Sequence, residues 1–358
     1  MARSNLSLVA VGDLVPTRRL WRDGAPVNRE FAKTVERLHS ADVVFGDLEM
    51  PLSARGTPRE KLITFRADPA IAEDLRLVGF DILSLANNHS MDFGEEALLD
   101  TVAALDSQGI RPVGAGNDIH MATAPVVTEV NGWKVGFTAW SCLLPVGSAA
   151  GERRAGHAPL HVTSAYEVNA YHEMEEPAHP PVVRSWPQAA ELQSAVQGVA
   201  ELRNRVDFVA ASVHWGYGFG TDIAEYQPTV AHALIDAGAD IVIGNHVHAI
   251  HGIEVHKGKA ILYSPGNFIS QQPREGEPPE VLAIYDQMSP DGYLATAEIE
   301  PGGRYQLRLT PITMDDEGLP VLAEGPRLQR IVDRLGLVCS QAGTRLAVED
   351  GTVEVRFG

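Results

Sequence analysis

Short apolar runs recur along the chain, and each one is only long enough to form a single strand. Six of these runs are rich in Val, Ile, Leu or Ala and lack strict polar alternation: LSLVAVGD (6–13), ADVVFGDLE (41–49), FDILSLANNH (80–89), VDFVAASVHWG (206–216), ADIVIGNHVH (239–248) and KAILYSPGN (259–267). A continuous apolar run is typical of a strand that is covered on both faces. We therefore expect a buried sheet at the centre of the fold.

Helical patterns lie between the predicted strands. Residues 28–40, 94–109 and 227–238 carry apolar side chains at helical spacing, and Gly109 and Gly238 stand where helix C-termini are expected. A further helix is expected over roughly 188–204. Strands that alternate with helices predict an α/β fold with helices on the faces of the sheet.

Two parts of the chain depart from this alternation. Residues 141–190 are rich in Pro, His and Glu and lack a clear period, so we expect an irregular excursion over the active-site face. From residue 281 onward the pattern predicts hairpins, at 300–309 and 346–357, around a short helix near 325–337. We therefore divide the chain into a catalytic domain (1–280) and a C-terminal hairpin and helix extension (281–358) packed on it.

Composition and charge narrow the function classes. The 358 residues carry a net charge of −18, and a phosphate-binding surface needs clustered Lys and Arg, so we expect neither nucleic acid nor an anionic membrane as a partner. The two cysteines, Cys142 and Cys339, lack the spacing of a redox or zinc motif. The first apolar run is too short for a secretory signal or membrane span, which predicts a soluble cytoplasmic protein. Composition leaves the oligomeric state open.

Polar side chains capable of binding a metal follow nearly every predicted strand. In chain order they are Asp13, Asp47, Glu49, Asn88, His89, His214, His246, His248 and Asn267. Taken alone, a Gly-Asp after a strand could be a turn or helix cap, Asn87-Asn88-His89 could be a turn, and His214 could be a satisfied, partly buried histidine. In open α/β sheets, however, ligands bind beyond the carboxyl ends of the strands, so neighbouring parallel strands would bring these side chains into one crevice. Their joint occurrence predicts a metal site.

The chemistry of these side chains indicates which metals they suit. Oxygen and imidazole ligands without thiolate favour Mn, Fe, Zn or Co over a structural zinc site. Carboxylates and three histidines exceed what one ion needs, so we expect one or two divalent ions, with Mn, Zn or Fe preferred. A metal-activated water would then serve as the nucleophile.

The same motifs resemble those of a known family. Gly-Asp, Gly-Asp, Asn-His, a lone His and Gly-x-His-x-His follow the order of the calcineurin-like metallophosphatases. VGDLVPTRR, GDLEMPLS, SLANNHSMDFG, SVHWG, LIDAGADIVIGNHVH and YSPGNF resemble the CapA family of poly-γ-glutamate capsule proteins over roughly residues 6–270. The resemblance implies a metallophosphatase-like sandwich of two sheets flanked by helices.

The resemblance also implies roles for individual residues. Asp47 would bridge two metals, while Asn88, His214 and His246 would complete one site. Asp13 and His248 would contribute to the other site. His89 is similar to the histidine that acts as general acid, and the unperturbed pKa of histidine suits that role.

The sequence departs from the family pattern at two positions. Val15 stands where ordinary metallophosphatases have the histidine of Asp-x-His, so Glu49 is expected to supply a carboxylate in its place. Gly218 stands where the family commonly has the glutamate of His-Trp-Gly-x-Glu. Glu225 or Asp222 could substitute for it, or could cap the following helix.

Further residues could bind substrate or support catalysis, but each could also have a purely structural role. Arg18 and Arg19 could hold a substrate carboxylate or phosphate, or form a solvated charge pair. Asp92 could orient His89 or cap a helix, and Trp215 could stack on substrate or pack a strand end. Asn267 could bind substrate from a tight turn. Several other histidines are expected at the surface: His157, His161, His172, His179, His251 and His256.

These observations lead to two function hypotheses from different classes. The first is a metal-dependent hydrolase that acts on a small-molecule or peptide-like anionic substrate, either an amide or ester such as a γ-glutamyl bond or a phosphoester. The second is a non-catalytic factor for polymer binding or for capsule and poly-γ-glutamate assembly, which keeps the pocket for binding only. An amidohydrolase barrel is a third alternative, although its His-x-His pair lies on the first strand and the pair here comes late.

Overall fold

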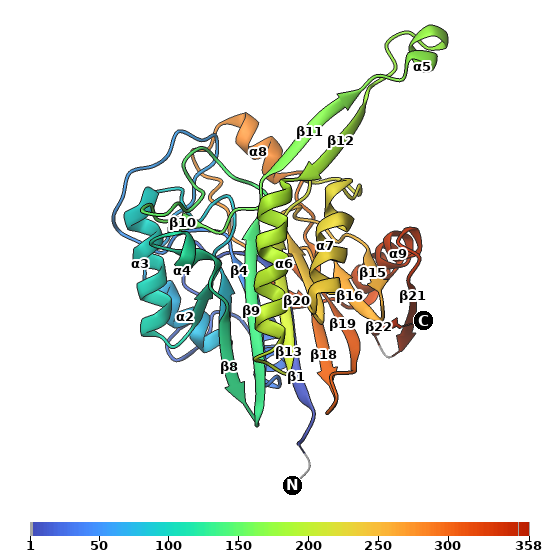
Figure 1. The fold of residues 1–358 in the computed structure, drawn as a ribbon. Helices are drawn as coiled ribbons and strands as arrows, with labels where there is room; N and C mark the ends of the chain where they lie inside the picture. The colour runs from blue at the N-terminus through green and yellow to red at the C-terminus, as the bar shows by residue number, and fades with distance from the viewer. Residues whose placement is uncertain (1–2, 350, 358) are drawn as a thin grey trace.

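The computed structural model describes residues 3–349 and 351–357, and its core is two β-sheets packed face to face (Figure 1). The first sheet has the order β21-β22-β19-β18-β1-β4-β5-β6, with β17 beside β1 and β20 beside β19. The second sheet has the order β15-β16-β14-β13-β9-β8. This arrangement confirms the α/β double-sheet fold and shows that the barrel alternative is wrong.

All six predicted strands form, and they divide between the two sheets. The first sheet contains β1 (Leu6–Val15), β4 (Val43–Leu48), β5 (Ile82–Ser84), β6 (Arg111–Val113) and β17 (Asn267–Ser270). The second contains β8 (Val126–Val130), β9 (Trp133–Ser141), β13 (Phe208–His214), β14 (Ile241–Asn245), β15 (Ile253–His256) and β16 (Lys259–Leu262). The run 259–267 therefore ends as a strand at Leu262, and Asn267 begins the next strand rather than ending this one.

Side chains alternate between the inner and outer faces of the sheets. Phe45 of β4 and Phe137 of β9 stack between the sheets with ring centroids 5.7 Å apart, while Val44 faces the helices on the other side. Helices α1 (Arg29–His39), α2 (Ile71–Val78) and α3 (Gly94–Ser107) cover the first sheet. Helices α6 (Ala189–Arg203) and α7 (Tyr226–Ala237) cover the second, in front in Figure 1. Both outer faces are thus buried, as the continuous apolar runs predicted.

The C-terminal part of the chain completes the first sheet. Strand β18 (Asp291–Ile299) pairs antiparallel with β1, and β19 (Tyr305–Met314) pairs with β18. Strands β20 (Pro320–Leu322), β21 (Arg345–Glu349) and β22 (Thr352–Arg356) extend it further. Helix α8 (Pro279–Tyr285) precedes these strands, and α9 (Gly325–Gln341) lies between β20 and β21.

The expectation that residues 141–190 are irregular is wrong for their second half. Strands β11 (Val162–Glu167) and β12 (Val182–Pro187) form a ribbon that carries α5 (Ala170–Glu175) and projects away from the body of the protein (Figure 1). Short two-residue strands also form: β10 (Gly156–His157) with β7 (Ala115–Gly116), and β2 (Trp21–Arg22) with β3 (Ala25–Pro26). Helix α4 (Ile119–Thr123) lies beside β7.

No helix in the described part of the chain has both the length and the apolar character needed to cross a membrane.

Gly12 lies where β1 passes closest to the turn before β17. A Cβ atom at this position would come within 1.8 Å of the backbone oxygen of Gly266, and the backbone of Asp13 donates to that same oxygen. Only glycine fits this contact. A larger residue would displace the backbone of Gly12 or Gly266, and with it Asp13 or Asn267, which follow them in the site.

Gly12→Ala should therefore lower the free energy of unfolding by at least about 1–3 kcal/mol, the usual cost of overpacking. Gly336→Ala, within α9 where a Cβ meets no neighbour, should instead raise it by about 0.5–1 kcal/mol. Equilibrium denaturation in urea measures both values. A Gly12→Ala protein with the wild-type midpoint would show that this contact does not constrain the fold.

Candidate metal centre

The two sheets meet at the carboxyl ends of their parallel strands, and the candidate ligands gather there. The first sheet supplies oxygen ligands from β1, β4 and the segments after β4 and β5: Asp13, Asp47, Glu49 and Asn88. The second sheet supplies imidazoles from the ends of β13 and β14: His214, His246 and His248. The crevice therefore lies between two facing sheets rather than along one open sheet.

One group of potential ligands surrounds His214. Its Nδ1 lies 3.0 Å from Oδ2 of Asp47 and 3.9 Å from Oδ1 of Asp13, and all three side chains are buried. Its Nε2 lies 2.6 Å from Oδ1 of Asn88. One oxygen or nitrogen atom from each of Asp13, Asp47 and His214 falls within 4.8 Å of the others, which is close enough for one ion.

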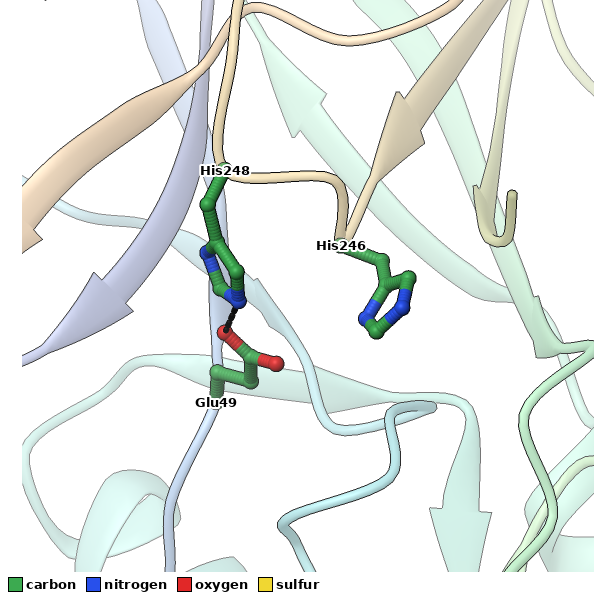
Figure 2. A group of neighbouring side chains, drawn as sticks. All are labelled: Glu49, His246 and His248. Carbon is green, nitrogen blue, oxygen red and sulfur yellow. Dashed lines mark ion pairs between the residues drawn. The ribbon is translucent and has the colours of Figure 1, made fainter. Parts of the chain in front are cut away.

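A second group joins Glu49 to the two histidines of the Gly-x-His-x-His motif. Figure 2 shows the carboxylate of Glu49 facing His248 with His246 beside them, and Oε2 of Glu49 lies 3.7 Å from Nε2 of His248. The ring centroids of His246 and His214 are 4.9 Å apart, so this group of potential ligands lies directly beside the first one. The resemblance implied a different partition, with His246 and His214 on one metal and His248 with Asp13 on the other.

The residues present fit a divalent cation. Both carboxylate oxygens of Glu49 and Nδ1 of His246 are buried without a hydrogen-bond partner among the described residues. Buried polar atoms are normally satisfied, and an unsatisfied carboxylate is especially costly. His246 and His248 also adopt φ angles of 99° and 50°, a left-handed backbone that non-glycine residues rarely occupy. Backbone strain of this kind is typical of functional sites.

Burial and neighbouring charges alter the protonation of the site. Burial alone would lower the pKa of His214, but the hydrogen bond to Asp47 and the negative charges of Asp47 and Glu49 raise it to about 10. Burial lowers the pKa of His246 and His248, so both imidazoles are neutral at neutral pH and ready to bind a metal. Burial and the charge of Glu49 raise the pKa of Asp13 well above its usual range.

A buried pair formed by His89 and Asp92 lies next to Asn88. Nδ1 of His89 lies 2.7 Å from Oδ2 of Asp92, and the backbone of Phe65 donates to that same oxygen. Lys61 forms an ion pair with the other carboxylate oxygen of Asp92 and donates to the backbone oxygen of Asn88, 2.7 Å away. Lys61 lies in a loop without a recognisable pattern, so only the tertiary structure reveals it.

Two asparagines hold potential ligands in place. Oδ1 of Asn267 lies 2.9 Å from Nδ1 of His248, so Asn267 orients an imidazole of the site. Nδ2 of Asn87 donates to the backbone oxygen of Leu48 and lies 3.4 Å from both carboxylate oxygens of Asp47, while its Oδ1 accepts from the backbone of His89. The sequence pattern indicated only a turn at Asn87.

Three substrate candidates have other partners in the structure. Arg19 donates to Asp74 and Glu73 of α2, and Arg18 donates to the backbone oxygen of Glu317. Trp215 is fully buried and donates to the backbone of Tyr263, which favours the packing alternative over stacking on substrate.

The structure also shows the surroundings of the two positions at which the sequence departs from the family pattern. Val15 is buried, and Gly218 has open space around it. Glu225 accepts a hydrogen bond from the backbone of Ser185 and pairs with Arg184, so it anchors the β11–β12 ribbon rather than a metal. Asp222 is exposed. Neither acid belongs to the groups of potential ligands found at this site. Glu49 lies 3.4 Å from Nε2 of His214 and 3.7 Å from Nε2 of His248.

The surface placement predicted for His157 and His251 is wrong, whereas His161 and His256 are partly exposed. His251 is fully buried and bonds the backbone oxygen of Gly220, 2.9 Å away, and His157 is fully buried as well. His161 pairs with Glu191, and His256 pairs with Asp236. His172 and His179 are exposed, as expected.

A separate group on the protein surface could also attract metal ions. His232, Glu254 and His256 offer ligand atoms within 4.8 Å of one another, but each side chain is partly exposed. The rings of His232 and His256 stack nearly parallel, with centroids 4.0 Å apart. An imidazole binds a metal in the plane of its ring, and two parallel stacked planes share no such position for one ion. This group therefore fits a metal less well than the buried one.

Metal binding at about pH 7.5 should release protons, because His214 must lose the proton that its raised pKa retains. The affinity should rise with pH until the pKa of His214 is passed. His214→Ala should lower that proton release by about one proton per site and weaken binding by more than about 10- to 100-fold, the loss caused by removing an outer-shell partner. Titration calorimetry with Mn²⁺ or Zn²⁺ in buffers of different ionisation enthalpy measures both quantities.

The matched control is His39→Ala, since His39 is exposed and its Nε2 lies 3.0 Å from the backbone oxygen of Leu77, away from the candidate ligands. Its affinity and proton release should equal those of the wild type. Equal losses in the two variants would contradict the ligand role of His214.

Comparison with known proteins agrees with the residues gathered at this site. A family model described as "Bacterial capsule synthesis protein PGA_cap" matches residues 7–272. The protein y4sH of Sinorhizobium fredii is 27% identical, across 98% of this chain and 93% of that protein.

Two further relatives carry functional names. The PGA biosynthesis protein CapA of Bacillus subtilis is 27% identical, across 75% of this chain and 64% of that protein. A probable polyglutamine synthesis accessory protein of Mycobacterium tuberculosis is 32% identical, across 64% of this chain and 56% of that protein. The family match covers well over half of the chain and includes every candidate metal ligand, so this chain belongs to the PGA_cap family of CapA-like bacterial capsule synthesis proteins.

Proposed function

We propose that this protein is a metal-dependent hydrolase. The buried group of carboxylates and imidazoles would hold one or two divalent ions, with Mn, Zn or Fe preferred by the oxygen and nitrogen ligands. A divalent ion bound there acts as a Lewis acid and activates water for attack. The remaining chemistry belongs to side chains of this protein.

The His89–Asp92 pair is the observation that carries the proposal. Asp92 and Lys61 both contact Nδ1 of His89, at 2.7 and 3.3 Å, which fixes the ring and leaves Nε2 as its other nitrogen. His89 directly follows Asn88, whose side chain contacts His214, so His89 lies beside the metal centre. A fixed histidine of this kind can donate a proton to a leaving group. A site built only for binding does not need this arrangement.

The names of the relatives suggest the substrate class. The Bacillus subtilis relative is named for PGA biosynthesis and the Mycobacterium tuberculosis relative for polyglutamine synthesis. An amide bond of the γ-glutamyl or peptide kind is therefore the first substrate to test, with a phosphoester as the alternative. Fold alone does not choose between these bonds.

The second candidate function is a non-catalytic factor in polymer assembly. Val15 favours it, because a buried valine stands where a metal-binding histidine is expected. Gly218 favours it as well, since neither Glu225 nor Asp222 supplies the missing glutamate. Such a factor would retain the buried ligands but turn over no substrate.

Metal-loaded protein should hydrolyse at least one member of a panel of γ-glutamyl anilides, small esters, peptide amides and aryl phosphates. His89→Gln should reduce kcat by about 10²- to 10⁴-fold, the usual contribution of a general acid, while metal content stays unchanged. Steady-state kinetics and elemental analysis of the same preparation measure the two effects.

His39→Gln serves as the matched control and should retain full activity. Absence of turnover across the panel, with metal present in the wild-type protein, would favour the assembly factor. A His89→Gln protein with unchanged kcat would remove His89 from the chemistry.

A further inference from the structure

A cavity of about 380 Å³ adjoins the metal centre on the side of Asn88. Asn88 lines this cavity, and its side chain also contacts His214, so the cavity is adjacent to the candidate ligands. Its polar lining comes from three segments that are distant in sequence: Arg59, Glu60, Lys61, Asn88, Asp92 and Ser148. A space of this size can hold one small group of a substrate.

Arg59 is an uncommitted cation in this lining. Its side chain forms no hydrogen bond or ion pair within residues 3–349 and 351–357, whereas Lys61 is engaged by Asp92 and Asn88. The backbone of Arg59 donates to the backbone oxygen of Asp92, 2.7 Å away, which ties it to the segment that carries His89. Its guanidinium also lies close to Gly147 on the opposite loop.

Ser148 supplies an independent indication of a ligand. The residue is 2% exposed and lines the same cavity, yet its Oγ has no hydrogen-bond partner among the described residues. An unsatisfied buried hydroxyl is destabilising. A ligand that accepts a hydrogen bond in the cavity would satisfy it.

The charges of the lining indicate which anion fits. Arg59 and Lys61 are matched by Glu60 and Asp92, so the formal charges cancel. A dianionic phosphate needs a clear excess of positive charge, whereas a monoanionic carboxylate needs one planar donor such as a free guanidinium. The cavity therefore suits a carboxylate better.

We propose that this cavity binds a carboxylate of the substrate, with Arg59 as the specificity-determining residue and the hydroxyl of Ser148 as a second donor. The assignment rests on the proposed function, because it places the carboxylate beside the bond that the metal centre attacks. It replaces the anion-binding role expected for Arg18 and Arg19, whose side chains are committed elsewhere.

The test measures binding, so it does not depend on turnover. Calorimetry with Zn²⁺-loaded protein should show that glutarate binds and that its neutral analogue glutaramide binds more weakly. Arg59→Gln should weaken glutarate binding about 10- to 100-fold, Arg59→Lys should weaken it less, and Ser148→Ala should weaken it several-fold. Zinc content should stay at the wild-type level in all three variants.

Two control variants separate the local charge from general effects. Glu60→Gln removes a carboxylate from the same cavity and should leave glutarate binding unchanged or tighten it. Arg22→Gln, an exposed arginine in β2, should change nothing.

Absence of glutarate binding to the wild type would overturn the proposal. So would glutarate binding that survives in Arg59→Gln but is lost in His214→Ala, because the carboxylate would then be bound by the metal itself. Binding that follows Arg59 in a protein inactive across the hydrolase panel would preserve this subsite while refuting the hydrolase.

Discussion

Three carboxylates buried against imidazoles, at the junction of two sheets, are the constraint on which the rest of the structure depends. Asp13, Asp47 and Glu49 are all fully buried. Charges removed from water are tolerated only when they are paired or bind a metal. The first sheet provides the carboxylates and the second provides the imidazoles, so the site forms only when the two sheets pack face to face. Packing of the core and the geometry of the site therefore depend on the same contact between the sheets.

The surrounding residues maintain that arrangement. Gly12 allows β1 to approach the turn before β17, and Asn267 in β17 then reaches His248. The backbone of His246 donates to the carboxylate of Asp13 across the sheet junction, at 3.0 and 3.2 Å, which helps to hold its left-handed conformation. Strain at His246 and His248 is thus balanced by contacts with the opposite sheet. The loop that carries both imidazoles is thus held by the first sheet at each of the two histidines.

The sequence predicted most of the sheet and the identity of the buried cluster, because continuous apolar runs and the polar residues after them are local signals. It failed where the signal was tertiary. The apolar pattern could not show that the strands divide between two sheets, that His251 is buried, or that Lys61 and Arg59 approach Asn88 from a loop. The hairpin of β8 and β9 was not predicted, although the sequence contains a local signal for it. Asn131 and Gly132, with φ angles of 50° and 78°, form the tight turn that Asn-Gly typically makes.

Anomalous diffraction from crystals of the metal-loaded protein, recorded at the absorption edge of the added ion, tests the central claim most directly. The account predicts an anomalous peak between the two sheets, within bonding distance of Asp47 and His214. A second peak, if two ions bind, should lie beside Glu49 and His248. Anomalous density only at the surface group of His232, Glu254 and His256, with the buried cluster empty, would contradict the account.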